Sequence, residues 1–185
     1  YVTAATDKMM ATAAGALIEL EDVQLLDVLE ILEALYVKAA ALACVHASEE
    51  ELSTILQTLD ALEREDGADK LGVSLRKFLG LVADASHNVL VATLCKFLND
   101  LLMRVAQNEI GGVTANWPRI AGRLGEDRRD LMNALLARDV EGAMAAAAAY
   151  HRHTRSLVKD AMDAYQGPPG DGLRDAFKRL RQTES

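Results

Sequence analysis

Residues 22–47, with the sequence DVQLLDVLEILEALYVKAAALACVHA, decide the fold of this chain. Their apolar side chains recur mostly at steps of three and four residues, which is the spacing of one face of an α-helix. The residues of this stripe are Leu25, Leu26, Leu29, Leu32, Val37 and Ala40. We therefore predict a long helix that directs an apolar face at a hydrophobic core.

The sequence Ser48-Glu49-Glu50-Glu51 follows this stretch directly and has the pattern of a capping box. In that motif the Ser48 hydroxyl accepts a hydrogen bond from the Glu51 amide, and the Glu51 carboxylate reaches back to the Ser48 amide. Apolar residues then recur at helical spacing, namely Leu52, Ile55, Leu56, Leu59 and Leu62. This pattern predicts a second helix that ends near Gly67.

Helical periodicity continues along the rest of the chain, and it predicts helices over residues 7–18, 69–85, 89–107, 126–138 and 140–165. Gly111-Gly112 and Trp117-Pro118 predict a loop, in which Pro118 suits a first helical turn. Residues 166–170 form a Gly/Pro breaker, and the tail from Asp171 has the pattern of a short amphipathic helix. Since no strand pattern or solenoid period appears, we predict an all-α fold, an antiparallel bundle of six to seven helices.

Composition excludes several classes of protein. The 185 residues are 50% hydrophobic and only 4% aromatic, with two cysteines, and no uncharged apolar run is long enough to span a membrane. Two cysteines exclude a disulfide scaffold, and a net charge of −8 argues against direct binding of nucleic acid. Acidic residues concentrate between residues 19 and 70, which predicts either a solvated acidic helix pair or a surface that repels DNA or meets a basic partner.

No set of residues has the spacing of a catalytic or metal centre. His151 and His153 are two apart, so on a helix they point in different directions. Asp84 and His87 could share a helical face, but no third metal ligand is placed beside them. Neither cysteine has an adjacent base, so Cys44 and Cys95 are interpreted as small core residues. We therefore predict that the chain is not an enzyme and holds no cofactor.

Three segments, in this order, carry a resemblance to a known family. They are residues 29–43 running into Ser48-Glu49-Glu50-Glu51-Leu52, then Phe78 followed by Ala85-Ser86-His87-Asn88, and finally residues 135–143, LLARDVEGA. In this order and spacing the chain resembles, over about residues 10–160, the C-terminal effector-binding (FCD) domain of FadR-type GntR transcription regulators. The last segment is similar to the turn between the final two helices of that family.

The resemblance implies a homodimer, a cytoplasmic location and ligand-controlled transcription regulation. Residues 1–5 resemble the end of a winged helix-turn-helix wing, so DNA would be bound only through an N-terminal domain that is missing here. We accordingly expect a wing or linker remnant at 1–5, an effector-binding and dimerisation domain at 6–166, and a C-terminal tail at 167–185. No contact with a membrane is expected.

The chain departs from the family at its metal site. Most members hold a divalent metal with one Asp and three His, and these positions fall here on Leu75, Leu79, Arg128 and Tyr150. A slip of one residue would place His151 at the last position, but the other three positions would still lack a ligand. A basic residue that the family uses to pair with an acidic effector aligns with Leu32. We therefore expect no bound metal.

These departures predict an apolar effector pocket lined by Leu32, Leu75 and Leu79, with polar groups from Tyr36, Arg128 and Tyr150. Such a pocket suits a lipophilic effector, for example a fatty acid, an acyl-CoA or a sterol-like acid, whose acidic head would pair with Arg128. Three alternatives stay open. The pocket is filled and the domain is a ligand-free dimerisation module regulated by a protein partner; or the register is wrong and the domain is a metal-dependent sensor of small carboxylates; or the bundle is a metal-dependent enzyme.

Overall fold

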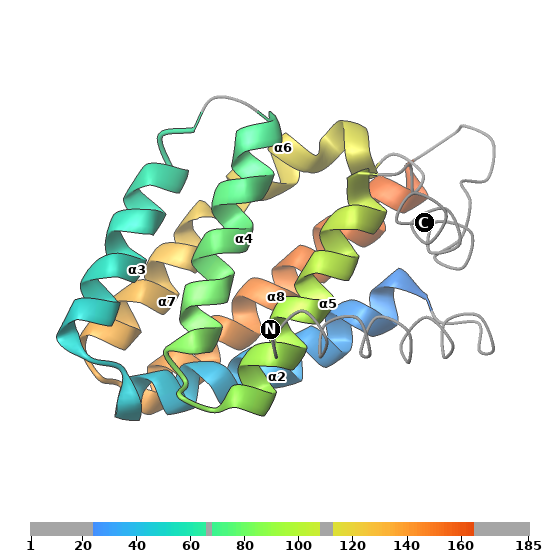
Figure 1. Cartoon of the computed structure of the whole chain (residues 1–185). Coiled ribbons are helices and arrows are strands. Elements are labelled where there is room, and N and C mark those ends of the chain that lie inside the picture. The colour runs from blue at the N-terminus through green and yellow to red at the C-terminus, as the bar shows by residue number, and fades with distance from the viewer. Residues whose placement is uncertain (1–23, 66–67, 108–112, 165–185) are drawn as a thin grey trace, which may run out of the picture.

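A computed structural model describes residues 24–65, 68–107 and 113–164. These residues form helices and, within those ranges, no strand (Figure 1), which confirms the all-α fold. The helices are α2 (Leu25–His46), α3 (Glu49–Leu62), α4 (Ala68–Asp84), α5 (Val89–Gln107), α6 (Val113–Arg123), α7 (Gly125–Leu136) and α8 (Val140–Asp163). The helix predicted at 7–18, the breaker at 166–170 and the tail lie outside the described residues. Among the described helices, none is long and apolar enough to cross a membrane.

Helix α2 is the centre of the bundle. It packs most extensively along α8 and also contacts α4, α5 and α7, so that α2 and α8 lie side by side (Figure 1). Residues on several sides of α2 are therefore buried, among them Leu29, Leu32 and Tyr36. Further along the helix, Ala39, Ala40 and Ala43 are fully buried and let the neighbouring helices approach closely. Each fully buried leucine contributes about 1.5–3 kcal/mol to the stability of the fold.

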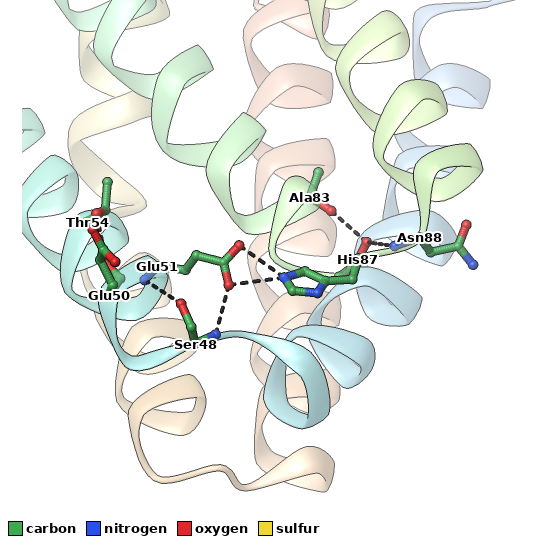
Figure 2. Close-up of polar contacts among 8 residues, drawn as sticks. Ser48, Glu50, Glu51, Thr54, Ala83, His87 and Asn88 are labelled. Carbon is green, nitrogen blue, oxygen red and sulfur yellow. Dashed lines mark hydrogen bonds and ion pairs between the residues drawn. The ribbon is translucent and has the colours of Figure 1, made fainter.

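The predicted capping box is present and also joins α3 to the turn between α4 and α5. The Glu51 amide donates to Ser48 Oγ at 3.1 Å, and the Ser48 amide donates to Glu51 Oε2 at 2.8 Å. His87 lies in that turn with a φ of 51°, in the left-handed region. Its Nε2 lies 3.0 Å from each Glu51 carboxylate oxygen (Figure 2). The contact between His87 and Glu51 thus joins the N-terminal cap of α3 to the turn between α4 and α5.

The turn between α7 and α8 is fixed to the end of α2. Arg138 has a φ of 55°, a conformation that reverses the chain after α7, and Asp139 caps α8 by accepting from the Gly142 amide at 2.9 Å. Arg138 Nη1 donates to the Cys44 carbonyl at 3.3 Å, and its Nη2 pairs with Glu49 at 2.7 Å. This turn, which lies in the last of the three segments that resemble the family, therefore joins α7 and α8 to α2 and α3.

The loop predicted at Trp117-Pro118 is wrong, because both residues lie inside α6. Pro118 is the sixth residue of this helix. Because proline has no backbone N–H, the helix lacks only the hydrogen bond that residue 118 would donate to the Thr114 carbonyl. The turn after the proline is tied into the core by Ile120, Ala121 and Leu124, each of which is at most 1% exposed. Tertiary packing therefore outweighs the helix-breaking tendency of the proline.

Most acidic side chains of α2 and α3, which belong to the acidic stretch between residues 19 and 70, form ion pairs with basic side chains of other helices and turns. Arg152 and Arg155 of α8 reach Glu33 at 3.2 and 3.9 Å, and Arg129 of α7 binds Asp60 at 3.0 Å and also pairs with Glu63. These ion pairs are partly exposed, so each contributes about 0–1 kcal/mol. These ion pairs favour one of the two interpretations of the acidic excess, a solvated acidic helix pair, over the other, a surface for a basic partner.

Candidate effector-binding site

A row of contacting, buried polar side chains crosses the middle of the bundle, and we describe it from Tyr36 of α2. The Tyr36 hydroxyl donates to the Leu79 carbonyl of α4 at 3.2 Å. The same oxygen accepts a hydrogen bond from the Asn99 side-chain amide of α5. Tyr36 is 1% and Asn99 is 3% exposed. Burial raises the pKa of the Tyr36 phenol well above its ordinary value, so the phenol is neutral and acts as a donor.

His151 of α8 continues this row of side chains, since its ring contacts both Tyr36 and Tyr150. Its ring stacks on Tyr36 with centroids 4.7 Å apart, and Tyr150 meets it edge-on at 5.0 Å. Both geometries are favourable for aromatic rings. Because the ring is fully buried and its charged form would be desolvated, the pKa of His151 falls to about 3. At neutral pH the imidazole is therefore uncharged.

Arg128, in the first turn of α7, lies at the opposite end of this row of buried side chains from Asn99. Its Nη1 donates to the Ala121 carbonyl of α6 at 2.9 Å, and the residue is only 3% exposed. Of the buried side-chain nitrogen and oxygen atoms in the described ranges, Arg128 Nε is the one that has no hydrogen-bond partner. The neighbouring carboxylate, Asp127, instead pairs with His153 at 2.8 Å. Arg128 is thus a buried cation held by neutral groups.

Tyr150 connects Arg128 to the rest of the cluster. Burial raises the pKa of its phenol, while the charge of Arg128 partly opposes this shift. The phenol therefore keeps its proton at neutral pH. Arg128 and Tyr150 together present a positive charge and a hydroxyl donor inside the bundle.

All six residues predicted to line the pocket are buried: Leu32, Tyr36, Leu75, Leu79, Arg128 and Tyr150. Tyr36 contacts Leu79, and Arg128 contacts Tyr150. Leu32 lies one turn before Tyr36, and Leu75 lies one turn before Leu79, within the same hydrophobic core.

Two residues of the cluster are absent from the sequence prediction. Asn99 is one helical turn after Cys95 and one turn before Met103, and both neighbours are buried. A single amide within such an apolar stripe is the signal that would have identified it. The sequence position of His151 gives no indication that its ring contacts two tyrosines.

Comparison with known proteins identifies the family. The FCD domain family matches residues 27–153, which is more than half of the chain. The chain belongs to the FCD domain family. As an FCD domain it is an effector-binding regulatory domain of FadR-type GntR transcription regulators. The search of curated protein sequences gave no match.

Among solved structures, the FCD domain is similar to E. coli McbR/YncC, with a TM-score of 0.56 and 20% sequence identity. The similarity covers 72% of this chain and 63% of that structure, so this chain spans less than two thirds of the protein it matches. At this identity the likeness shows a shared fold.

The donor set of this FCD domain does not fit the divalent metal that the family resemblance implies. At the four expected positions stand two leucines, a guanidinium and a phenol, and a buried Arg128 cation would repel a metal ion. Within the described residues, no group of three or more His, Cys, Asp or Glu side chains could hold a metal. The imidazole in the cluster, His151, stacks on Tyr36 and meets Tyr150 edge-on, and it has no carboxylate beside it in the described contacts.

Proposed function

We propose that this FCD domain senses a lipophilic effector, such as a fatty acid, an acyl-CoA or a sterol-like acid, and does so without a metal. One observation carries the proposal. The positions where the family resemblance places metal ligands hold buried leucines together with Arg128, a buried cation that no carboxylate neutralises in the described structure. Apolar walls with a few convergent polar groups suit a ligand that has a long tail and one polar end.

The apolar side of the site would bind the tail. Leu32 of α2 and the pair Leu75 and Leu79 of α4 belong to one buried cluster. Each CH₂ group of a ligand that leaves water contributes about 0.8 kcal/mol, so a dodecyl tail gains roughly 9 kcal/mol before the costs of association and of opening the core. These costs are several kcal/mol, so useful affinity requires a long tail.

The signal would pass through the helices that meet at the cluster. Its residues come from α2, α4, α5, α7 and α8, so a ligand among them favours one packing of these helices over another. In a cytoplasmic homodimer that carries two DNA-binding domains, such a shift changes the spacing of the two DNA-reading heads. The effector must bind one state more tightly, since equal affinity shifts nothing.

Within the whole regulator, we assign residues 6–166 to effector binding and dimerisation and residues 167–185 to a tail. Residues 1–5 would be the remnant of the wing or linker that precedes the domain. These boundaries are tested by limited proteolysis. Cleavage confined to 1–5 and 167–185 supports them, and rapid cleavage elsewhere contradicts them.

A thermal-shift experiment tests the effector class. The domain is mixed with octanoate, dodecanoate, hexadecanoate, dodecanoyl-CoA, cholate or citrate, each with and without EDTA. We expect the long-chain or sterol-like ligands to raise the Tm equally with and without EDTA. Stabilisation by citrate that EDTA abolishes would instead support the metal-dependent sensor, and a panel without any stabilising ligand would support the ligand-free module.

A variant pair on α4 localises the effect. Leu79→Ala removes a buried wall of the proposed site, whereas Val73→Ala alters a residue on the same helix that is 66% exposed. We expect Leu79→Ala to reduce the shift caused by the best ligand and Val73→Ala to leave it unchanged. Equal responses of the two variants would place the ligand elsewhere.

A further inference from the structure

Exposed apolar side chains gather at the end of the bundle where α2 meets α3 and α7 meets α8. Within the described ranges, eight large apolar side chains are exposed, and six of them come from the helix termini at this end. These six, which we call the apolar end, are Val45, Val89, Leu90, Leu136, Val140 and Met144. Exposed apolar side chains that gather in one region are typical of an interaction surface.

Contacts between the helix termini hold the apolar end together. Arg138, between α7 and α8, donates to the Cys44 carbonyl near the end of α2 at 3.3 Å. His87, between α4 and α5, lies 3.0 Å from the Glu51 carboxylate at the start of α3, and its ring centroid is 6.3 Å from that of His46 in α2. The turns and helix termini that carry the six apolar residues therefore lie at one end of the bundle (Figure 1).

The same end carries acidic side chains that are not neutralised. Glu50 of α3 and Glu141 of α8 are exposed and form no ion pair within the described part of the chain. Glu49 pairs with Arg138, but its side chain is 88% exposed. A partner that fits this surface therefore combines apolar side chains with basic ones.

Charge distinguishes among the segments of this chain that could cover the apolar end. A second copy of the same end would bring like charges together. Residues 1–23 contain four acidic side chains and one basic side chain, so they would be repelled as well. Residues 174–181, in the C-terminal tail, instead contain four basic side chains and one acidic side chain. Of these three occupants, the tail has the complementary charge.

The sequence of the tail also has a matching apolar pattern. Leu173, Phe177 and Leu180 are spaced by four and three residues, so on a helix they share one face. Each of the three is followed directly by a basic residue, which places a basic stripe beside the apolar one. A helix of about 15 residues is marginal in water by itself, so packing on another surface would have to stabilise it.

The reach of the chain favours the tail of a second copy. Val140 and Ala164 lie at opposite ends of α8, whose 24 residues span about 36 Å. Leu173 is nine residues beyond Ala164, and nine fully extended residues span at most about 32 Å. The tail of the same chain is therefore too short to place Leu173 at Val140, whereas a second copy approaches from outside the bundle.

We propose that residues 171–185 of a second copy of this chain cover the apolar end, so that the two chains of a homodimer exchange their C-terminal tails. Leu173, Phe177 and Leu180 of the tail pack on the apolar end, and the basic stripe beside them meets Glu50 and Glu141. This surface is distinct from the proposed effector site, because the two share no residue.

Zero-length carbodiimide cross-linking of the full chain tests the proposal. The reagent joins an amine to a carboxylate in contact with it, and Lys178 is the one lysine among residues 171–185. Unlabelled and isotope-labelled chains are allowed to exchange before the reaction, and mass spectrometry locates the joined peptides. We expect links from Lys178 to Glu50 or Glu141 that join a labelled chain to an unlabelled one.

Matched variants assign the links to the apolar contact. Phe177→Ser removes the central apolar side chain of the tail and should weaken docking about tenfold, with a corresponding loss of links from Lys178. Val89→Ser should also reduce these links, because Val89 is 82% exposed at the apolar end. Val73→Ser alters an exposed valine of α4 that lies outside the apolar end, and it should leave the links unchanged.

The other results would overturn the proposal in different ways. Links from Lys178 to Glu50 or Glu141 of the same chain alone would overturn the exchange between copies. Links that join the apolar ends of two copies would make this surface an end-to-end dimer contact. If Lys178 forms no link at this end while Lys96 and Asp84, 2.6 Å apart, are joined, the tail is not the occupant. Equal yields in Val89→Ser and Val73→Ser would lead to the same conclusion.

Discussion

Replacing Arg128 with methionine distinguishes a ligand receptor from a structural brace. In the structure Arg128 makes one hydrogen bond to the Ala121 carbonyl and contacts Tyr150, while its Nε has no partner. Methionine has a similar length and no charge, so Arg128→Met removes the buried cation without leaving a large cavity.

The expected change in stability follows from opposing contributions. A hydrogen bond from a charged donor contributes about 1.5–3 kcal/mol, which the variant loses. The variant also loses the unpartnered buried Nε, which costs about 1–3 kcal/mol in the parent protein. The Ala121 carbonyl keeps a partner, because the Leu124 amide also donates to it at 3.3 Å. The net change therefore lies between a loss of about 2 kcal/mol and a gain of about 1.5 kcal/mol.

Thermal unfolding of the ligand-free domain measures this change. For a domain of this size, 1 kcal/mol corresponds to about 2–4 °C in Tm, so Arg128→Met should shift the Tm by no more than about 8 °C. A buried and fully satisfied structural arginine would instead cost about 3–5 kcal/mol on removal. A fall in Tm of more than about 10 °C would refute the reasoning and identify Arg128 as a brace.

Three further predictions concern the cap, the cluster and the pH dependence. Ser48→Ala removes the oxygen that accepts from the Glu51 amide and should lower the unfolding free energy by about 1 kcal/mol in urea titrations; no change would mean that the cap is dispensable. Tyr36→Phe leaves the buried Asn99 amide without its acceptor and should cost about 1–3 kcal/mol, whereas a neutral result would show that water replaces the hydroxyl. For His151 the folded pKa of about 3 lies below the unfolded value of 6.5, so only the unfolded state binds the proton between these pH values, and stability falls as the pH decreases below 6.5. At pH 5 this loss is about 2 kcal/mol, and it should be absent in His151→Phe; an identical pH dependence in both proteins would contradict the assignment.

Much of the fold was predictable from local patterns in the sequence. The stripe from Leu25 to Ala40 and the cap at Ser48 depend on spacing alone, and both are present in the structure. The start of α8 at Asp139 was likewise marked by the turn that resembles the family. Local signals of this kind are reliable because the helix period and the capping hydrogen bonds involve residues only three or four apart.

Helix α6 shows where local patterns fail. Pro118 favours a loop or a helix start in any single-sequence analysis, but the burial of Ile120 and Ala121 against the rest of the bundle stabilises a helix that includes it. The acidic excess is a similar case. Its partners, Arg129, Arg152 and Arg155, lie at least 60 residues further along the chain, so only the fold shows that the acids are paired.

The candidate site was predictable as a set of positions but not as a network. The resemblance placed Leu75, Leu79, Arg128 and Tyr150, and these residues are buried in the structure. No sequence pattern indicates that Asn99 bonds to Tyr36, or that Arg128 Nε lacks a partner. Both facts depend on side-chain geometry between helices far apart in the chain.

Native mass spectrometry of the freshly purified domain, followed by denaturing analysis of what it releases, tests the central claim most directly. We expect a dimer that carries a lipid-sized adduct and no metal, and the released compound would name the effector class. A dimer that carries one divalent metal per chain would contradict the account, because the register that places Leu75, Leu79, Arg128 and Tyr150 at the ligand positions would then be wrong.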